Sequence, residues 1–405
     1  MADIRPFHGI RPADALAGDI IALPYDVMSR AEAREMVAAN PRSFLRITRS
    51  DAELPDSVDE HSREAYDAGR EALDRFLADG LLQQDDTPCF YLYTQTWRGR
   101  TQLGLMALCS VDEYDAGSIK KHELTRPTKE QDRVDHIDAM DAQTGLVFLA
   151  YRDRPDVAVL LERLAGGPVA WDVTTDDSVR HRLQVVADPD DVAALQAAFA
   201  DINALYIADG HHRSAAASRV AAARSGAGTS GWFLAGIFPD SQLQVLAYNR
   251  VVADLHGHDK ASFRAAVEER FRVEPSETPA PDERGRFTMY LDGAWHCLTP
   301  LPGVVPIDDP VGRLDAAVLQ DNVLAPLLGI TDPRRDTRIH FVGGIRGHEA
   351  LSQAVDRGDA AVAFHLFPTG MDQLFDVADA DMLMPPKSTW FEPKLRAGVV
   401  LHRIS

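Results

Sequence analysis

A short apolar strand, a polar turn and an alanine-rich helix follow one another at residues 205–224, and this order constrains the fold more than any other feature of the chain. The run Leu205–Ala208 predicts a buried strand, and residues 214–224 predict a helix that ends before Gly226. Between them lie the five residues from Asp209 to Arg213. We therefore expect a mixed α/β (α+β) architecture, with the polar turn at the point where strand meets helix.

The turn has the composition of an anion-binding site. Free backbone N–H groups and the positive end of the helix dipole coincide at a helix start, and Gly210 lets the backbone approach a ligand closely. Arg213 adds a planar, permanently charged fork for phosphate oxygens, and His211 and His212 add donors. Asp209 is placed to hold one of these groups or a metal-bound water. The alternative is a helix cap in which the histidines pack locally, but the convergence of polar residues favours a functional site.

The chain is longer than one hydrophobic core usually supports, because it has 405 residues of which 45% are hydrophobic. We expect three parts: residues 1–150 with a polar active-site stretch, residues 151–255 with the His-His-Arg turn, and residues 256–405, an α+β part with a Lys-Ser-Thr loop. No apolar run has the length of a membrane span, and no signal-peptide pattern begins the chain. We therefore expect a soluble, cytoplasmic protein.

Net charge narrows the expected partners. Lys plus Arg number 42 against 62 Asp plus Glu, which gives a formal charge of -20. Such a surface repels nucleic acid and anionic membranes, and no sustained basic run overrides it, so we expect small-molecule partners and neither nucleic acid nor membrane. The acidity is typical of a solvated surface, with cation binding as the alternative. Cys89, Cys109 and Cys297 have no metal-ligand spacing and are expected to be reduced core residues.

Capping and turn signals place further elements. Ser29 and Glu32 predict a capping box for a helix that Pro41 ends. Residues 89–96 and 102–111 predict a hairpin, and a second hairpin crosses the turn Asp292-Gly293. Further helices are expected at 61–82, 157–164, 190–201, 261–271 and 315–328, and further strands at 145–151, 232–238, 244–251, 339–342 and 361–366. The stretch 113–141 has few apolar residues and is either a solvated helix or a functional loop that faces a cavity.

The run from Asp209 to Ala216 resembles the phosphate-binding motif of the ParB/sulfiredoxin superfamily, including its free-serine kinases. The whole chain resembles the family catalogued as domain of unknown function 1015. The matching marks span almost the full length: Pro24, Tyr25, Asp26 and Val27; Asn40, Pro41, Ser43 and Phe44; His122, Glu123, Thr125, Asp132 and Arg133; and Pro385 through Lys394. The resemblance implies a ParB/sulfiredoxin-like unit around the turn, with additional α+β parts.

The resemblance also implies an activity. Members similar to the serine kinases phosphorylate free L-serine to O-phosphoserine, with pyrophosphate as donor in the bacterial type and ADP in the archaeal type. The chain has no Walker A loop, no kinase glycine-rich loop and no Rossmann glycines, and pyrophosphate needs none of these nucleotide cradles. We therefore expect a small-molecule kinase that depends on pyrophosphate.

Phosphoryl transfer requires a cationic clamp, an in-line acceptor and a group that takes the hydroxyl proton. The expected clamp consists of Gly210, His211, His212, Arg213, Arg133 and Lys387, with Ser388 and Thr389 as further donors. The expected catalytic group consists of Glu123 or Asp209 as general base, with His122 beside them. The loop of Tyr25 and Asp26 is expected to bind substrate. Mg²⁺ is expected because pyrophosphate is usually handled as its magnesium complex, and the candidate ligands are Asp26, Asp132 and Asp209.

Plainer interpretations of these motifs stay open. The Lys-Ser-Thr group also fits an ordinary turn after two prolines, Glu123 fits a surface charge, and the Pro-Tyr-Asp loop fits a rigid turn. Two other functions also remain: a phosphate-ester or nucleotide hydrolase, and a ParB-like nucleotide switch or phosphometabolite sensor. The charge of -20 and the lack of a basic helix-turn-helix argue against a switch that binds DNA.

Overall fold

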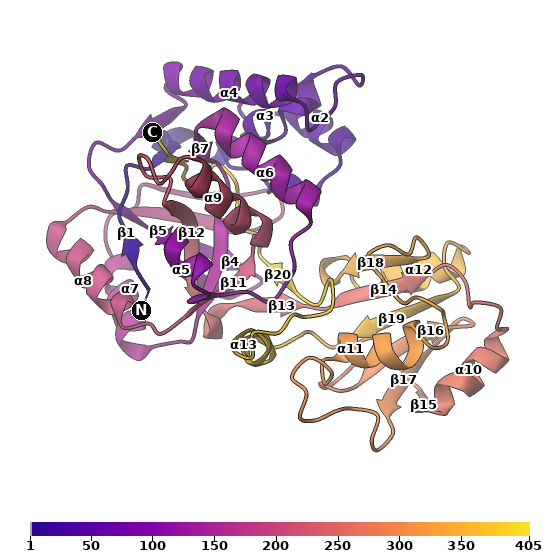
Figure 1. Cartoon of the computed structure of the whole chain (residues 1–405). Helices are drawn as coiled ribbons and strands as arrows, with labels where there is room; N and C mark the ends of the chain where they lie inside the picture. The colour runs from indigo at the N-terminus through magenta and orange to yellow at the C-terminus, as the bar shows by residue number, and fades with distance from the viewer. Residues whose placement is uncertain (1) are drawn as a thin grey trace. The chain divides into compact units, whose positions relative to one another are not determined.

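The computed structural model describes residues 2–405, which form two compact units (Figure 1). Unit 1 consists of the chain up to Leu243 together with Pro393–Ser405, and unit 2 consists of Gln244–Glu392. The three parts expected from the sequence do not coincide with these units. Strands from both sides of residue 150 hydrogen-bond in one sheet, and the last residues of the chain return to unit 1.

A nine-stranded mixed sheet forms the centre of unit 1. Its strand order is β6-β11-β8-β12-β5-β4-β10-β9, with β1 paired to β5. The strands are β1 Ile4–Arg5, β4 Phe90–Trp97, β5 Arg100–Ser110, β6 Ile119–Lys120, β8 Val147–Tyr151, β9 Trp171–Thr174, β10 Arg180–Val186, β11 Leu205–Asp209 and β12 Trp232–Pro239. The pairs β6/β11 and β8/β12 are parallel, whereas β11/β8 and β12/β5 are antiparallel. Two small antiparallel pairs complete the unit: β2 Ile10–Pro12 with β3 Leu82–Gln84, and β7 Ala142–Gln143 with β21 His402–Arg403.

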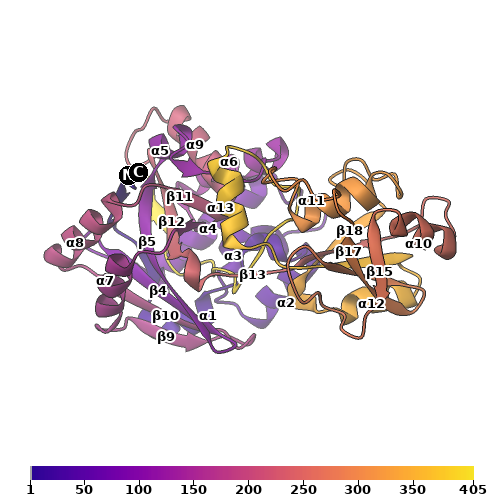
Figure 2. The ribbon, with the colours of Figure 1, turned by 90° about the horizontal axis from the view of Figure 1, so that it is seen from below.

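Helices cover this sheet. They are α1 Ala17–Ile20, α2 Arg30–Ala39, α3 Leu45–Thr48, α4 Arg63–Ala78, α5 Val111–Asp115, α6 Pro127–Met140, α7 Pro155–Ala165, α8 Pro189–Ala200 and α9 His211–Ala223. Helix α6 packs against both α9 and α4 (Figure 1), and α7 packs against α8 (Figure 2). The largest apolar cluster of unit 1 joins the sheet to α7, α8 and α9, and a second cluster lies among α2, α3 and α4. This packing fixes α9 between the sheet and α6.

Unit 2 has a six-stranded sheet in the order β15-β17-β16-β19-β14-β18, in which every pair is antiparallel. The strands of the unit are β13 Gln244–Leu246, β14 Tyr248–Val252, β15 Phe271–Pro275, β16 Phe287–Leu291, β17 Ala294–Pro300, β18 Ile339–Gly343, β19 Val362–Leu366 and β20 Trp390–Glu392. Its helices are α10 Lys260–Glu268, α11 Asp315–Leu319, α12 Glu349–Asp356 and α13 Met371–Asp379. A separate apolar core joins the sheet to α10 and α11.

The predicted mixed α/β class and most predicted elements are confirmed. The capping box of Ser29 and Glu32 starts α2, and the two expected hairpins are β4/β5 and β16/β17. Three expectations change. Helix α9 begins at His211 rather than at Ser214, the helix expected at 315–328 ends its α-helical part at Leu319, and the strand expected at 244–251 is divided into β13 and β14.

The stretch 113–141 is largely helical, but it is not a solvated helix. Asp132, Arg133 and His136 of α6 are buried, because this face of the helix packs against α4 and α9. Cys89 and Cys109 are buried free thiols as expected, whereas Cys297 is partly exposed. Within residues 2–405, no helix combines the length and apolar character that crossing a bilayer requires.

Candidate functional site

The junction between β11 and α9 has the strand–turn–helix form expected from the sequence. A bulge separates Ile207 from Asp209 in the pairing of β11 with β8, and Gly210 follows with a φ of 99°. This left-handed conformation favours glycine, and a Cβ at Gly210 would lie 3.3 Å from the Cα of Val147. This turn therefore favours a residue that lacks a side chain at position 210.

No side chain caps the start of α9. The carbonyl of Gly210 accepts the N–H groups of Arg213 and Ser214, at 2.9 and 3.0 Å. The N–H groups of His211 and His212 precede these bonds, and such groups have no acceptor within their own helix. Because the positive end of the helix dipole lies at the same place, this start is suited to a bound anion.

His211 packs against His122 in the interior of unit 1. The two rings are perpendicular with centroids 4.5 Å apart, and the backbone N–H of His122 lies 3.5 Å from Nε2 of His211. His122 is only 2% exposed and His211 only 5%. Burial lowers the pKa of His122 to about 4 and holds the pKa of His211 well below its ordinary value. Both imidazoles are therefore neutral near pH 7.

One ring nitrogen of His122 is hydrogen-bonded, and the other has no hydrogen-bond partner among the described residues. The ring hydrogen-bonds the backbone carbonyl of Ile207, whereas Nδ1 is buried and has no partner among the described residues. The carbonyl can only accept, so Nε2 carries the proton and Nδ1 presents a lone pair. Glu123 is the next residue along the chain. One ligand atom from each of His122, Glu123 and His211 lies within 4.8 Å of the others, and this is the one such group of three that residues 2–405 contain.

Asp209 is ion-paired with Lys394, a residue that returns to unit 1 with the C-terminal segment. The Nζ–Oδ2 distance is 3.1 Å. Burial alone would raise the pKa of Asp209, but Lys394 and then Arg213 outweigh it and keep the pKa well below its ordinary value. The sequence analysis assigned Lys394 no role of its own, since only its place at the end of the 385–394 family mark singled it out.

Arg213 and Arg133 both contact Tyr25. Their guanidinium carbons lie 5.6 and 3.8 Å from the centre of the Tyr25 ring. Arg213 donates from Nη1 to the carbonyl of Leu146 at 2.8 Å, and its Nη2 lies 3.6 Å from Oδ1 of Asp26. That separation is too long for a hydrogen bond, so Arg213 has no closely bonded carboxylate among the described residues.

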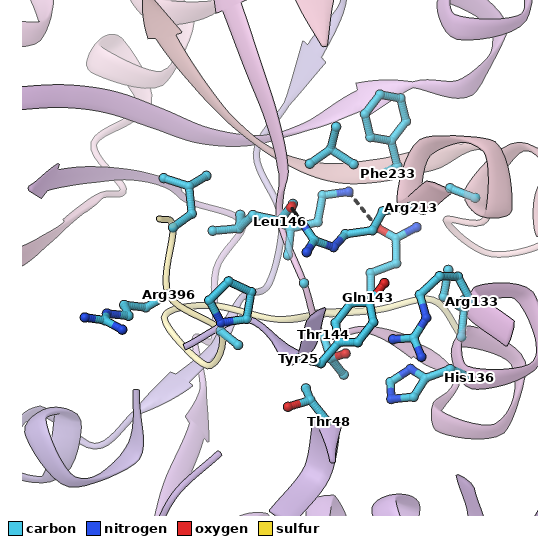
Figure 3. Close-up of a pocket in the computed structure, with 18 residues that line it drawn as sticks. Tyr25, Thr48, Arg133, His136, Gln143, Thr144, Leu146, Arg213, Phe233 and Arg396 are labelled. Carbon is cyan, nitrogen blue, oxygen red and sulfur yellow. Dashed lines mark hydrogen bonds between the residues drawn. The ribbon is translucent and has the colours of Figure 1, made fainter. Parts of the chain in front are cut away.

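These side chains line a pocket within unit 1. Figure 3 shows it, and its polar lining consists of Tyr25, Thr48, Arg133, His136, Gln143, Thr144, Arg213 and Arg396. His136 is only 5% exposed, and its buried Nε2 has no hydrogen-bond partner among the described residues. Burial lowers the pKa of His136 to about 3, so its ring is neutral. No sequence pattern distinguishes His136 from the other polar residues of its helix.

Each of the three candidate magnesium ligands, Asp26, Asp132 and Asp209, lies beside a cationic side chain. Asp132 accepts hydrogen bonds at 2.7 Å from the hydroxyl of Tyr66 and at 2.8 Å from Nε of Arg133, and Nδ1 of His61 lies 2.7 Å from it. Asp209 is held by Lys394, and Asp26 lies beside Arg213. None of the three belongs to the group formed by His122, Glu123 and His211.

The remaining predicted residues are placed as follows. His212 accepts the backbone N–H of Arg126 at Nε2, at 3.0 Å, which leaves Nδ1 as its donor. Lys387, Ser388 and Thr389 belong to unit 2. There Ser388 donates to the carbonyl of Pro385 at 2.7 Å, as in an ordinary turn, and their contribution to a phosphate clamp stays a prediction.

Comparisons with known proteins identify a family and several similar solved structures. The family model described as Protein of unknown function (DUF1015) matches residues 4–317. No curated protein matches the chain. Similar solved structures include a free serine kinase in complex with AMP, which is 10% identical with a TM-score of 0.36 over 71% of this chain and 86% of that chain. Others are SbnI with a C-terminal truncation from Staphylococcus aureus (10%, 0.39, 72% and 84%) and a conserved hypothetical protein from Pyrococcus furiosus (12%, 0.34, 72% and 92%).

Proposed function

Because the chain belongs to the DUF1015 family, whose description leaves function open, we propose its function from the site itself: it is a phosphotransferase. The proposed reaction moves a phosphoryl group from pyrophosphate to the hydroxyl of a small amino acid, with free L-serine as the first candidate and O-phosphoserine as the product. The observation that carries the proposal is the start of α9, where the N-cap residue Gly210 has no side chain to cap the helix and Arg213 stands in the first turn.

The charge around this start supports an anionic ligand. Arg213 is largely buried, yet the nearest carboxylate, Asp26, lies 3.6 Å away. A buried guanidinium without a closely bonded carboxylate is available to a phosphate, which it would bind through two parallel N–H···O bonds. Arg133 is already bonded to Asp132, so we assign it the lesser part of the clamp.

We place the acceptor amino acid in the pocket that Tyr25, Arg133 and Arg213 line. The open nitrogen of His136 and the hydroxyl of Thr144 supply polar partners there, and the ring of Tyr25 supplies an apolar wall. Acceptor and donor would then meet at Arg213, which belongs both to the pocket and to the first turn of α9. Holding the two reactants in this way is the main contribution that phosphoryl transfer asks of a protein.

The general base is either Glu123 or Asp209. Asp209 is the weaker base, because Lys394 and Arg213 stabilise its charged form. The transition state of phosphoryl transfer is loose, so removal of the hydroxyl proton matters less than charge and position. We therefore expect neutralisation of either carboxylate to cost less activity than loss of Arg213.

We propose that Mg²⁺ enters with pyrophosphate and is not held by a site of the described residues alone. Magnesium prefers six oxygen ligands, whereas Asp132 and Asp209 are already ion-paired and the one group of potential ligands among residues 2–405 contains two imidazoles. In this proposal magnesium belongs to the pyrophosphate complex that enters as substrate.

A second candidate function is the hydrolysis of a phosphate ester or nucleotide. The observation that favours it is the group of His122, Glu123 and His211, since His and Glu ligands also occur at hydrolytic metal centres. Phosphate release without an acceptor would identify this activity.

One assay separates these functions. The protein is incubated with L-serine, Mg²⁺ and, in turn, pyrophosphate, ADP, ATP and CTP, and phosphoserine and free phosphate are measured by mass spectrometry and colorimetry. The proposal expects phosphoserine with pyrophosphate, and none when serine is omitted. Phosphate release that is independent of serine would replace it with the hydrolase, and no product with any donor would refute both.

A further inference from the structure

We propose that His122, Glu123 and His211 bind a divalent transition-metal ion of the zinc, cobalt or manganese class in unit 1. The proposal concerns metal affinity and not turnover, and it would leave Asp209 as the general base of the proposed transfer, because Glu123 would be a metal ligand. It differs from the expected role of magnesium, which the sequence analysis linked to Asp26, Asp132 and Asp209.

The open nitrogen of His122 is the first observation. Nδ1 is buried in a residue that is 2% exposed, and it has no partner among residues 2–405. Leaving a buried polar atom unpaired destabilises the folded state. Such an atom is explained when a bound group completes it, and His122 belongs to a group of three residues whose potential ligand atoms lie within 4.8 Å of one another.

The second observation is the way His122 is held. A histidine that binds metal usually donates its other ring N–H to a carbonyl or carboxylate, which fixes the tautomer and orients the lone pair. The carbonyl of Ile207 has this role for His122. The arrangement therefore resembles the outer shell of a metal site and not only a packed imidazole.

The third observation is the ligand set. Two imidazoles and one carboxylate suit zinc and its neighbours, whereas magnesium prefers oxygen atoms in octahedral geometry. The three ligand atoms lie within 4.8 Å of one another. Zinc bonds of about 2.1 Å would bring them roughly 3.5 Å apart, so only a small inward rotation of the side chains is needed. A fourth position would remain for water or a substrate oxygen.

Local charge acts in both directions. The helix dipole of α9 and Lys121 oppose a cation near His211. Glu123 and Asp209 supply two negative charges, and Asp209 interacts electrostatically with both histidines. Because Lys394 already neutralises Asp209, a divalent ion held by two neutral imidazoles and Glu123 would keep one net positive charge at the ligand group, which is compatible with an anion bound at the same helix start.

The test measures metal binding without any substrate. The full-length protein is stripped with a chelator and dialysed against Zn²⁺, Co²⁺, Mn²⁺ or Mg²⁺ in turn, and bound metal is measured by elemental mass spectrometry. We expect about one Zn²⁺ or Co²⁺ per chain, little Mg²⁺, and with Co²⁺ the strong visible absorption of a four-coordinate site. His122→Ala and His211→Ala should each weaken binding at least about a hundredfold, because even second-shell partners are worth up to that factor.

His212→Ala is the matched control, since His212 is adjacent to His211 in the first turn of α9 but lies outside the ligand group. It should bind as the wild type does. Glu123→Gln keeps the shape of the side chain and should still weaken binding, which distinguishes loss of a ligand from misfolding. Thermal unfolding gives a second readout, because zinc should raise the melting temperature of the wild type but not that of His122→Ala. The proposal is overturned if the wild type retains no metal, if magnesium binds as tightly as zinc, or if His212→Ala loses as much as His211→Ala.

Discussion

Helices α2 and α9 differ in how their first backbone N–H groups are satisfied. Each leaves backbone N–H groups without acceptors inside the helix. In α2 the side chain of Ser29 accepts the N–H of Glu32 at 3.3 Å, and the carboxylate of Glu32 accepts the N–H of Ser29 at 2.7 Å. In α9 the preceding residue is Gly210, and no side chain takes this part.

The surroundings differ in the same sense. Ser29 and Glu32 are exposed, so water would satisfy the start of α2 even without its cap. His211 is 5% exposed, and the start of α9 lies among buried polar groups. Water can accept the free N–H groups of a helix start at the surface, but buried N–H groups destabilise the fold unless another group accepts them. α2 is completed by its own residues, and we propose that a ligand completes α9.

The largest expected effect is that of Arg213→Ala on phosphoryl transfer. Loss of a two-bonded charge contact should lower kcat/KM at least about a hundredfold, which corresponds to about 3 kcal/mol. Arg213→Lys should recover only part of the activity, because an ammonium group does not form the same fork. The comparison is made by steady-state kinetics on protein whose thermal unfolding is unchanged.

Arg219 is the matched control for this variant. It lies on the same helix and pairs at the surface with Glu130 at 3.2 Å. Exposed pairs of this kind contribute little, so Arg219→Ala should keep its activity within about twofold. Equal losses in the two variants would remove the distinction between the start of α9 and the rest of the helix.

Asp315 of unit 2 tests whether a buried polar group with an open atom is enough to mark a functional site. Its Oδ2 has no partner among the described residues, and burial raises its pKa to about 7 even though the N–H of Gly285 and the charge of Arg284 act against this. The folded state therefore binds the proton more tightly than the unfolded state, and stability is lost as pH rises from about 4 to 7. We expect this loss to reach a few kcal/mol, with no effect on ligand binding.

The measurement is the difference in free energy of unfolding between Asp315→Asn and the wild type, from urea titrations. This difference cancels the other titrating groups and should shift in favour of the variant as pH rises from about 4.5 to 7.5. A constant difference would contradict the raised pKa. If Asp315→Asn also changed the affinity for phosphate, Asp315 would contribute to ligand binding, and its role would not be purely structural.

Local sequence signals predicted both helix starts but not their environments. The capping box needs only residues 29 and 32, and the Gly210 turn needs only the junction of one strand with one helix. The first turn was nevertheless placed three residues too late, because the polar letters of His211 and His212 resemble a loop. Their burial comes from packing against α6 and the sheet, which no local pattern encodes.

The contacts between distant residues of the site could not be predicted from the sequence, because they also depend on tertiary packing. Lys394 reaches Asp209 across 185 residues, and His122 meets His211 across 89. Each residue belonged to a motif that marked the family, but only folding brings those motifs together. Even a contact between neighbouring residues can be missed: the motif of Arg133 is visible in the sequence, but its hydrogen bond to Asp132 is not.

Gly210→Ala changes the geometry of the start of α9 without removing charge. A side chain at a φ of 99°, with its Cβ 3.3 Å from Val147, should cost about 2 kcal/mol in the free energy of unfolding. Gly80, at the end of α4, has a φ of 69° with no atom within 4 Å of the added Cβ, so Gly80→Ala should cost about 1 kcal/mol. Isothermal titration with pyrophosphate should detect binding in the second variant and a clear loss in the first. Equal affinities would mean that the amides of α9 do not contact the ligand.

Ser29→Ala has the smallest expected effect and examines the other half of the contrast. Removal of the hydroxyl leaves the N–H of Glu32 to water, which should lower the free energy of unfolding by about 1 kcal/mol. Because α2 is completed by its own side chains, this decrease should be the same with and without pyrophosphate in urea titrations. The wild type itself should gain stability when pyrophosphate is added, since a ligand that binds only the folded state raises the free energy of unfolding. If pyrophosphate instead rescued Ser29→Ala and left the wild type unchanged, the ligand would be completing α2, and the roles assigned to the two helix starts would have to be exchanged.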